Sequence, residues 1–271
     1  MKVAAIQMVS GPALDDNLRV ARELLEQAAQ GGAELAVLPE YFCLMGYKDT
    51  DKLALRETAG AGVIQQFLAD TARALQIWIV GGTLPMATDA PDRVRNTTLV
   101  FDPTGACVAR YDKIHLFRFS NGAEQYDEGR VIDAGDTPVQ FDLQARSGQR
   151  WRVGLSVCYD LRFPELYRAH ARAGADLLLV PSAFTHTTGQ AHWEVLLRAR
   201  AVENLAYVLA PAQGGVHANG RHTWGHSMLV DPWGSILAQR GQGAGVVAGE
   251  LDAQRLSAVR AQLPALTHRV L

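Results

Sequence analysis

The sequence predicts an α/β protein: a four-layer α-β-β-α sandwich built from two pseudo-equivalent β-α-β-α-β-β halves. One observation is a repeated apolar segment that ends in proline, GGAELAVLPEYF at 31–42 and AGADLLLVPSAF at 173–184. Another is a repeated pair of strands around an Asp-Pro turn, TTLVFDPTGACVARYDK at 97–113 and HSMLVDPWGSILAQRGQ at 226–242. In addition, nearly all-apolar strands alternate with amphipathic helices, as in parallel sheets covered by helices.

The first half opens with an apolar strand at 3–8, followed by a helix at 15–30. The apolar positions of this helix recur at helical spacing and predict one buried face; they are Leu18, Ala21, Leu25 and Ala28. After the proline-ended strand come a second helix at 62–76 and a third strand, IWIVGG at 77–82. The hairpin of 97–113 completes this half.

The second half repeats this order. A strand, VGLSVCYD at 153–160, precedes a helix at 164–174, and the next helix and strand are expected at 192–206 and 207–212. Two units that each carry helices on one sheet face can bury the other face against each other. A single doubly wound sheet is the alternative, but no Gly-x-Gly-x-x-Gly follows the strand at 3–8, so a dinucleotide fold has little support.

Composition limits the class of protein. The chain has 271 residues, 48% hydrophobic and 20% charged, with a net charge of −2, and we expect a single domain over 1–271. The charge pattern gives no footprint for nucleic acid or a membrane surface, and no segment resembles a signal peptide or a transmembrane span. We therefore expect a cytoplasmic protein without nucleic-acid or membrane partners. The three cysteines are too scattered for a disulfide framework.

Three reactive side chains fall at predicted strand ends. Glu40 ends the second strand, within the segment 31–42, Lys113 ends the first hairpin, and Cys158 lies where a strand meets the next helix. Ligands of parallel α/β sheets bind beyond the carboxyl ends of the strands, so we expect these groups on one side of the fold. Each also has an ordinary structural interpretation: a buried cysteine, a loop or N-cap carboxylate, and a solvated lysine. Cys107, by contrast, is expected only to fill a strand.

The three groups together fit nucleophilic catalysis at a carbonyl. A thiol at a strand-to-helix junction faces the positive end of a helix dipole, which favours the thiolate, and the tight turn leaves the Tyr159 N–H free for an oxyanion. Glu40 can take the proton of Cys158 and later give it to a leaving amine. The ammonium of Lys113 can stabilise the oxyanion. Lysine is rare in this chain, with four against 22 arginines, which singles out Lys113.

At these residues the sequence resembles the nitrilase, or carbon–nitrogen hydrolase, superfamily. Its Glu-Lys-Cys triad matches LAVLPEYF with Glu40, YDKIHLF with Lys113 and GLSVCYDLRFPEL with Cys158, and the likeness extends over nearly the whole chain. The resemblance implies the same four-layer sandwich, usually as a homodimer, and no cofactor. It also implies a second glutamate, which Glu128 matches, to position the substrate or assist proton transfer.

Within the superfamily the sequence is similar to the Nit branch of amidases, and its segments around 192–204 and 225–234 are closer to amidases acting on deaminated glutathione than to those acting on alpha-ketoglutaramate. This implies hydrolysis of a primary amide of a small carboxylate-bearing molecule through a thioester, with release of ammonia. Substrate contacts are expected from Tyr159 and Arg162; further positions in the matching segments are Phe184, Thr185 and His192. Arg162 could instead pair with Glu165 or lie in a subunit interface.

Two alternatives differ in class. His217, His222 and His226 cluster in HANGRHTWGH, but the glycines of this segment favour a loop over a metal-binding helix, and no metal is expected. A catalytically silent binding protein on the same fold is the other alternative. The presence of all three triad residues argues against it. The irregular stretch 114–138 is expected to line the site.

Overall fold

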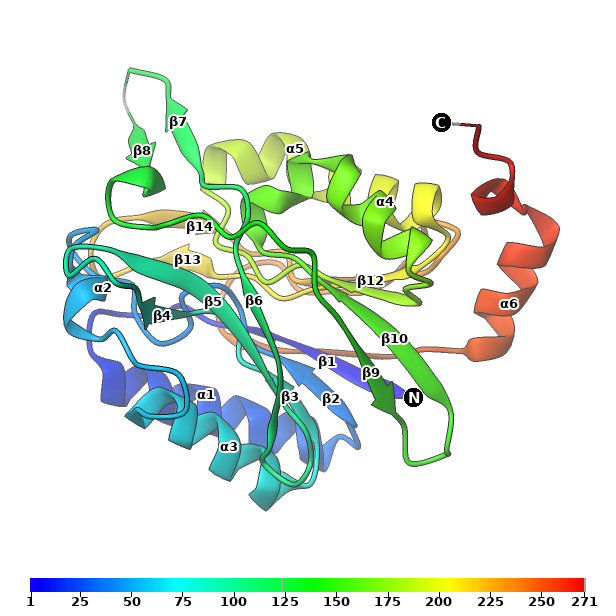
Figure 1. Cartoon of the computed structure of the whole chain (residues 1–271), viewed down its shortest axis with the longest axis horizontal. Helices are drawn as coiled ribbons and strands as arrows, with labels where there is room; N and C mark the ends of the chain where they lie inside the picture. The colour runs from blue at the N-terminus through cyan, green and yellow to red at the C-terminus, as the bar shows by residue number, and fades with distance from the viewer. Residues whose placement is uncertain (123, 271) are drawn as a thin grey trace.

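The computed structural model describes residues 1–122 and 124–270, and the four layers are visible in Figure 1. The first sheet has the order β17-β1-β2-β3-β5-β4, with β6 on the free side of β5. Its strands are β1 (Lys2–Gln7), β2 (Leu35–Val37), β3 (Trp78–Val80), β4 (Leu84–Ala87), β5 (Val94–Phe101), β6 (Cys107–Asp112) and β17 (Gly245–Glu250). Strands β1, β2 and β3 run parallel, as the buried apolar segments predicted.

The second sheet repeats this plan in the order β16-β15-β12-β11-β10-β9. Its strands are β9 (Gln140–Gln144), β10 (Arg150–Leu155), β11 (Leu177–Leu179), β12 (Tyr207–Ala210), β15 (Met228–Val230) and β16 (Ile236–Gln239). Two small hairpins lie outside the sheets: β7 (Arg118–Ser120) with β8 (Gln125–Asp127), and β13 (Gly214–Val216) with β14 (His222–Trp224).

Helices cover the outer face of each sheet. In Figure 1, α1 and α3 lie below the first sheet and α4 and α5 above the second. The helices are α1 (Leu14–Gln30), α2 (Asp51–Ala54), α3 (Val63–Leu75), α4 (Pro164–Arg172), α5 (His186–Asn204) and α6 (Ala253–Gln262). Short 3₁₀ turns are η1 (Glu128–Arg130), η2 (Cys158–Arg162) and η3 (Ala265–Thr267). No helix within the described ranges is long and apolar enough to cross a bilayer.

The alternation of side chains along β1 shows how the layers are held together. Val3 and Ala5 belong to the apolar cluster shared by the two sheets, whereas Ala4 and Ile6 pack with the helices α1 and α3. Lys2 is exposed, and the residues from Val3 to Gln7 are all buried, so β1 is covered on both faces. The predicted apolar stripe of the first helix, Leu18 to Ala28, is buried in the same layer. The predicted four-layer fold is confirmed.

Two strands exchange between the halves in a way that the repeat did not predict. Strand β9 follows the first half in sequence but pairs antiparallel with β10 of the second sheet, and β17 follows the second half but pairs antiparallel with β1. The exchange ties the two sheets together at their edges. Helix α5 also begins at His186, six residues before the predicted helix start, because Thr185 caps it by accepting a hydrogen bond from the Thr188 N–H.

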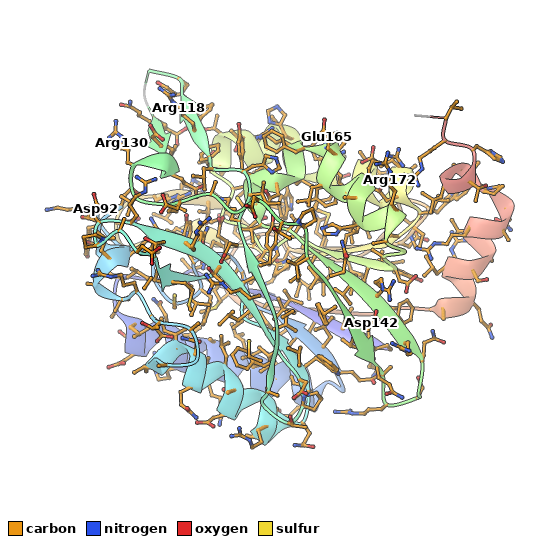
Figure 2. The ribbon with its side chains drawn as sticks, viewed as in Figure 1. Asp92, Arg118, Arg130, Asp142, Glu165 and Arg172 are labelled. Atoms are coloured by element: carbon orange, nitrogen blue, oxygen red, sulfur yellow. The ribbon has the colours of Figure 1, made fainter. Side chains whose placement is uncertain are left out.

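Charged side chains lie on the outside of the sandwich, as Figure 2 shows for Arg118, Asp142 and Glu165. The C-terminal helix α6 packs on its own chain: Leu256 and Val259 are buried, and Arg260 donates to Asp176 at 2.8 Å. Cys107 begins β6 but its side chain is exposed, so the expectation that it fills the strand interior is wrong.

Candidate active site

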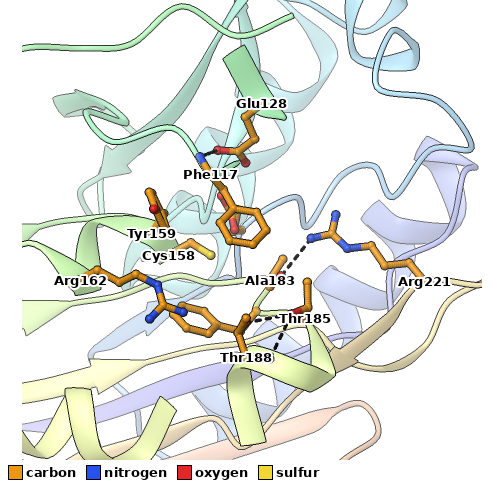
Figure 3. Close-up of a pocket in the computed structure, with 11 residues that line it drawn as sticks. Phe117, Glu128, Cys158, Tyr159, Arg162, Ala183, Thr185, Thr188 and Arg221 are labelled. Atoms are coloured by element: carbon orange, nitrogen blue, oxygen red, sulfur yellow. Dashed lines mark hydrogen bonds between the residues drawn. The ribbon is translucent and has the colours of Figure 1, made fainter. Parts of the chain in front are cut away.

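The fold brings Glu40 and Cys158 to one pocket beyond the ends of β2 and β10, and Lys113, which follows β6, lies buried behind Glu40 at 2.8 Å. The residues lining the pocket are Glu40, Phe117, Glu128, Cys158, Tyr159, Arg162, Ala183, Phe184, Thr185, Thr188 and Arg221. Figure 3 shows the Cys158 sulfur pointing into this pocket between Tyr159 and Phe117. The three side chains therefore lie close together, with Glu40 in contact with both Cys158 and Lys113.

Cys158 occupies a tight turn. Its φ of 49° is left-handed, a conformation that non-glycine residues adopt only when the surroundings enforce it. The Cys158 N–H donates to the Pro181 carbonyl at 2.9 Å, and the preceding Val157 N–H donates to Asp160 at 2.8 Å. These bonds fix the direction in which the thiol leaves the backbone.

Asp160 ties this turn to the strand that carries Lys113. Its fully buried carboxylate accepts hydrogen bonds from the Tyr111 hydroxyl at 2.6 Å and from the His115 N–H at 3.0 Å. Tyr111 and His115 flank Lys113 in sequence, so this one carboxylate fixes the positions of both the Cys158 turn and the segment that carries Lys113. The sequence carried a signal for this role, since an aspartate within an apolar and aromatic segment needs such partners when it is buried.

Lys113 lies between two carboxylates and is completely buried. Its Nζ donates to Glu40 Oε1 at 2.8 Å and to the two oxygens of Glu128 at 3.0 and 2.8 Å. Burial opposes the charge of Lys113, but Glu128 and Glu40 raise its pKa above the ordinary value. Burial likewise opposes ionisation of Glu128, yet Lys113 holds the pKa of that carboxyl below its usual value. The ammonium thus stays charged at neutral pH.

Both carboxylates have further donors that fix their orientation. Asn96 Nδ2 donates to Glu40 at 3.0 Å. The Tyr41 hydroxyl donates to Glu128 at 2.6 Å, and the Phe117 N–H donates to the same carboxylate at 2.7 Å. Glu128 comes from the stretch 114–138 that was expected to line the site. Its place beside Lys113 suits a residue that holds the ammonium in position.

The environment of Cys158 corrects one expectation. Burial, followed by the charge of Glu40, raises the pKa of the thiol well above its ordinary value, and the opposing effect of Lys113 is smaller. The predicted helix-dipole effect fails because α4 begins only at Pro164, after the turn η2. The resting thiol is therefore neutral, so a reaction through this sulfur requires that its proton be removed. Glu40 contacts the thiol and is placed to accept that proton.

The predicted substrate contacts differ in position. Tyr159, Arg162, Phe184 and Thr185 line the pocket, but His192 does not: it is exposed on α5 and lies 3.3 Å from Arg162. The Arg162 guanidinium lies over the rings of Tyr159 and Phe184, at 5.8 and 5.5 Å from the centroids. Within the described residues it forms no ion pair with Glu165, which is exposed on the outer side of the helix layer (Figure 2).

Sequence reasoning missed four of the lining residues: Phe117, Ala183, Thr188 and Arg221. The stretch 114–138 indicated the region of Phe117. The capping position of Thr188 and the loop position of Arg221 gave no comparable signal. Arg221 enters the pocket from the loop before β14, and its Nη2 donates to the Ala183 carbonyl at 3.1 Å (Figure 3).

The histidine alternative does not fit a metal site. His217 is buried and its two ring nitrogens contact the Ser10 carbonyl at 2.8 Å and the Thr223 hydroxyl at 2.7 Å. His222 stacks on His186 and His226 on Trp224. No group of three or more potential metal ligands occurs among the residues that the structure describes. These contacts give the histidines packing and hydrogen-bonding roles.

Comparison with known proteins agrees with this geometry. A family model described as carbon–nitrogen hydrolase matches residues 2–261. The deaminated glutathione amidase of Synechocystis sp. is 45% identical over 98% of this chain and 97% of its own length. The protein of the same name from Homo sapiens is 38% identical over 98% of this chain and 81% of its own length.

Solved structures show the same likeness. Nit3 of Saccharomyces cerevisiae superimposes with a TM-score of 0.87 at 31% identity, covering 100% of this chain and 97% of that one. An amidase from Nesterenkonia sp., a glutamate-to-glutamine mutant with acrylamide added at its active-site cysteine, has a TM-score of 0.77 at 29% identity. That match covers 97% of this chain and 98% of the other.

Proposed function

The chain belongs to the carbon–nitrogen hydrolase family, and we propose that it is a cysteine amidase acting on deaminated glutathione. The observation that supports the proposal is that Glu40 and Cys158 line one pocket, where Glu40 contacts both the Cys158 thiol and, at 2.8 Å, the buried Lys113 ammonium. The name shared by relatives at 37–45% identity supports the substrate. Glu40, Lys113 and Cys158, with Glu128 as the positioning residue, form the proposed catalytic machinery.

In the proposed reaction Glu40 takes the proton of Cys158 as sulfur attacks the amide carbon. Lys113 and the Tyr159 N–H stabilise the oxyanion of the tetrahedral intermediate. As Glu40 becomes protonated, its attraction for Lys113 weakens, so the ammonium can turn toward the new negative charge. Glu40 then protonates the leaving nitrogen, a thioester remains on Cys158, and Glu40 activates the water that hydrolyses it. Glu128 keeps Lys113 charged and oriented throughout.

The leaving group depends on the substrate. The sequence predicts release of ammonia. Ammonia is the leaving group of alpha-ketoglutaramate, the alternative substrate, because that compound is a primary amide. Deaminated glutathione has substituted amide nitrogens, so its cleavage releases an amine that carries a carboxylate. Its acyl portion also carries a carboxylate, and Arg162 at the pocket wall is placed to bind it. A silent binding protein would need none of the buried charges described above.

A substrate panel tests this proposal. Purified protein is assayed for amine, ammonia and acid release with deaminated glutathione, alpha-ketoglutaramate, an aliphatic amide, a nitrile and a carbamoyl amino acid. We expect the highest kcat/KM with deaminated glutathione, at least tenfold above the aliphatic amide, because a bound carboxylate contributes a charge-assisted hydrogen bond. Turnover of the nitrile alone, or of no compound, would contradict the proposal.

We also propose a homodimer formed through the exposed face of α5. Val195 and Val202 on this helix and Trp233 in the neighbouring turn are 62%, 45% and 52% exposed and line a shared hollow. A stable interface between two subunits buries roughly 800 Å² of surface on each subunit. Val195→Asp is expected to convert a dimer into a 29.4 kDa monomer in light scattering. The exposed Val108→Asp serves as the control, and a monomeric wild type would refute the dimer.

A further inference from the structure

A second, wider cavity adjoins the catalytic pocket. It lies between the loop after Glu40, the β7–β8 hairpin and the loop before β14, and has a volume of about 420 Å³. The catalytic pocket itself is narrow, with a cavity volume of about 10 Å³, which is close to the space of one water molecule. Arg221 lines both, so any substrate larger than its amide group has the wider cavity as a neighbour.

The wider cavity is rich in positive charge. Lys48, Lys52 and Arg221 line it, and Asp49 is the carboxylate among its lining residues. Two of the four lysines of the chain are thus placed here. The Lys52 side chain is 17% exposed; its Nζ lies 3.6 Å from the more exposed carboxylate of Asp49 and 4.9 Å from the centre of the Tyr41 ring. Among the lining residues three cations face one carboxylate, and this balance favours an anion, while Glu128 and Glu40 act on Lys52 from the side of the catalytic pocket.

Arg221 is the least satisfied of these cations. Its Nη2 donates to the Ala183 carbonyl at 3.1 Å, whereas its Nη1 lies 3.8 Å from the Met45 sulfur, a weak acceptor. The guanidinium also lies over the Tyr126 ring, 5.1 Å from its centre. Its Nε is buried without a hydrogen-bond partner in the part of the chain that the structure describes. A buried guanidinium nitrogen without a hydrogen-bond partner destabilises the folded protein, and a bound carboxylate would supply the missing acceptor.

We propose that Lys48, Lys52 and Arg221 form a distal subsite that binds the terminal carboxylate of the substrate's leaving group. The proposal rests on the function proposed above, in which Glu40 protonates the leaving nitrogen. The leaving group must therefore lie on the Glu40 side, and the residues immediately after Glu40, beginning with Tyr41, form the wall of the wider cavity. Figure 3 shows Arg162 and Arg221 reaching the pocket from opposite sides, as two separate carboxylates on one substrate require.

The chemical consequence is selectivity for amides whose nitrogen carries a short peptide-like group ending in a carboxylate. The cavity volume falls within the range of roughly 300–1,000 Å³ that is typical of small-molecule sites. Tyr41, Tyr126 and Met45 supply apolar wall around the cations. Primary amides such as alpha-ketoglutaramate would leave this subsite empty and gain nothing from it.

Binding to a Cys158→Ala protein tests the subsite without turnover. The two ligands are deaminated glutathione and its C-terminal carboxamide, which lacks only the distal charge, and affinities are measured by titration calorimetry. We expect the carboxylate ligand to bind about tenfold more tightly or better, as for one charge-assisted contact. Adding Lys52→Met should reduce this preference to less than threefold, and Lys52→Arg should restore most of it.

Lys2→Met is the matched control, because Lys2 is an exposed lysine at the far end of β1 from the site, and it should leave the tenfold preference intact. Equal affinity for the two ligands, or no binding of either, overturns the distal subsite. Failure of the proposed function would give a different result. The wild-type protein would then hydrolyse none of the amides in the panel, whatever the ligand preference of the Cys158→Ala protein.

Discussion

Replacing Cys158 with alanine is expected to lower kcat for amide hydrolysis on the order of 10⁴-fold or more, because the proposed covalent route through a thioester is lost. The fold should be preserved. Alanine at this left-handed position carries no greater backbone cost than cysteine, and it keeps an apolar side chain in the buried cluster to which Cys158 belongs. Steady-state assays and urea unfolding curves on the same preparation measure both quantities.

Two comparisons make this result specific. Cys107→Ala removes an exposed thiol at the start of β6 and should retain full activity. Denaturing mass spectrometry of wild-type protein quenched during turnover should show one acyl adduct on the peptide containing Cys158, and none in the Cys158→Ala protein. Activity above one tenth of wild type in the Cys158→Ala protein would show that this sulfur is not the nucleophile.

The fold could be predicted from the sequence wherever burial determines the pattern of apolar residues. Strands β1, β2 and β3 are short apolar runs because each is covered on both faces, and the helix α1 shows its buried stripe directly. The partners of β9 and β17 were not predictable. Their alternating residues indicate a sheet with one face buried, but alternation does not specify which sheet edge a strand joins.

The site likewise has features that the sequence predicts and features that it does not. The strand ends located Glu40, Lys113 and Cys158, because backbone topology alone places such residues at one edge. The protonation of the thiol was predicted wrongly, since it depends on burial and on the distance to Glu40, neither of which is local in sequence. Arg221 was missed for a related reason: it reaches the pocket across the fold, from a loop 63 residues after Cys158.

The second large effect concerns Lys113. Lys113→Met is expected to lower kcat at least 10²-fold, because the oxyanion loses its cation, and to lower the free energy of unfolding by about 3–5 kcal/mol at pH 8. The destabilisation follows from the surroundings. Glu40 and Glu128 both point at the Lys113 ammonium, so its removal leaves two carboxylates facing each other in a site with almost no solvent.

The pH dependence of this destabilisation tests whether repulsion between the two carboxylates causes it. In the wild type the pKa of Glu128 lies below its ordinary value, so its contribution to stability is present above about pH 4.3 and is lost as the pH falls further. In the variant one of the two carboxyls must hold a proton, and its pKa rises above the unfolded value. That group stabilises the fold at low pH and loses its contribution as the pH rises through the raised pKa. The stability deficit should therefore be larger at pH 8 than at pH 5 in urea titrations.

A double variant separates the structural role of Lys113 from its chemical role. Lys113→Met with Glu128→Gln removes one of the two opposed carboxylates, so most of the lost stability at pH 8 should return. Activity should not return, because Glu40 remains alone with no cation to stabilise the oxyanion. If stability and activity recover together, Lys113 acts only by neutralising Glu128. If neither single nor double variant loses stability, the buried charges are not coupled as their distances of 2.8 to 3.0 Å indicate.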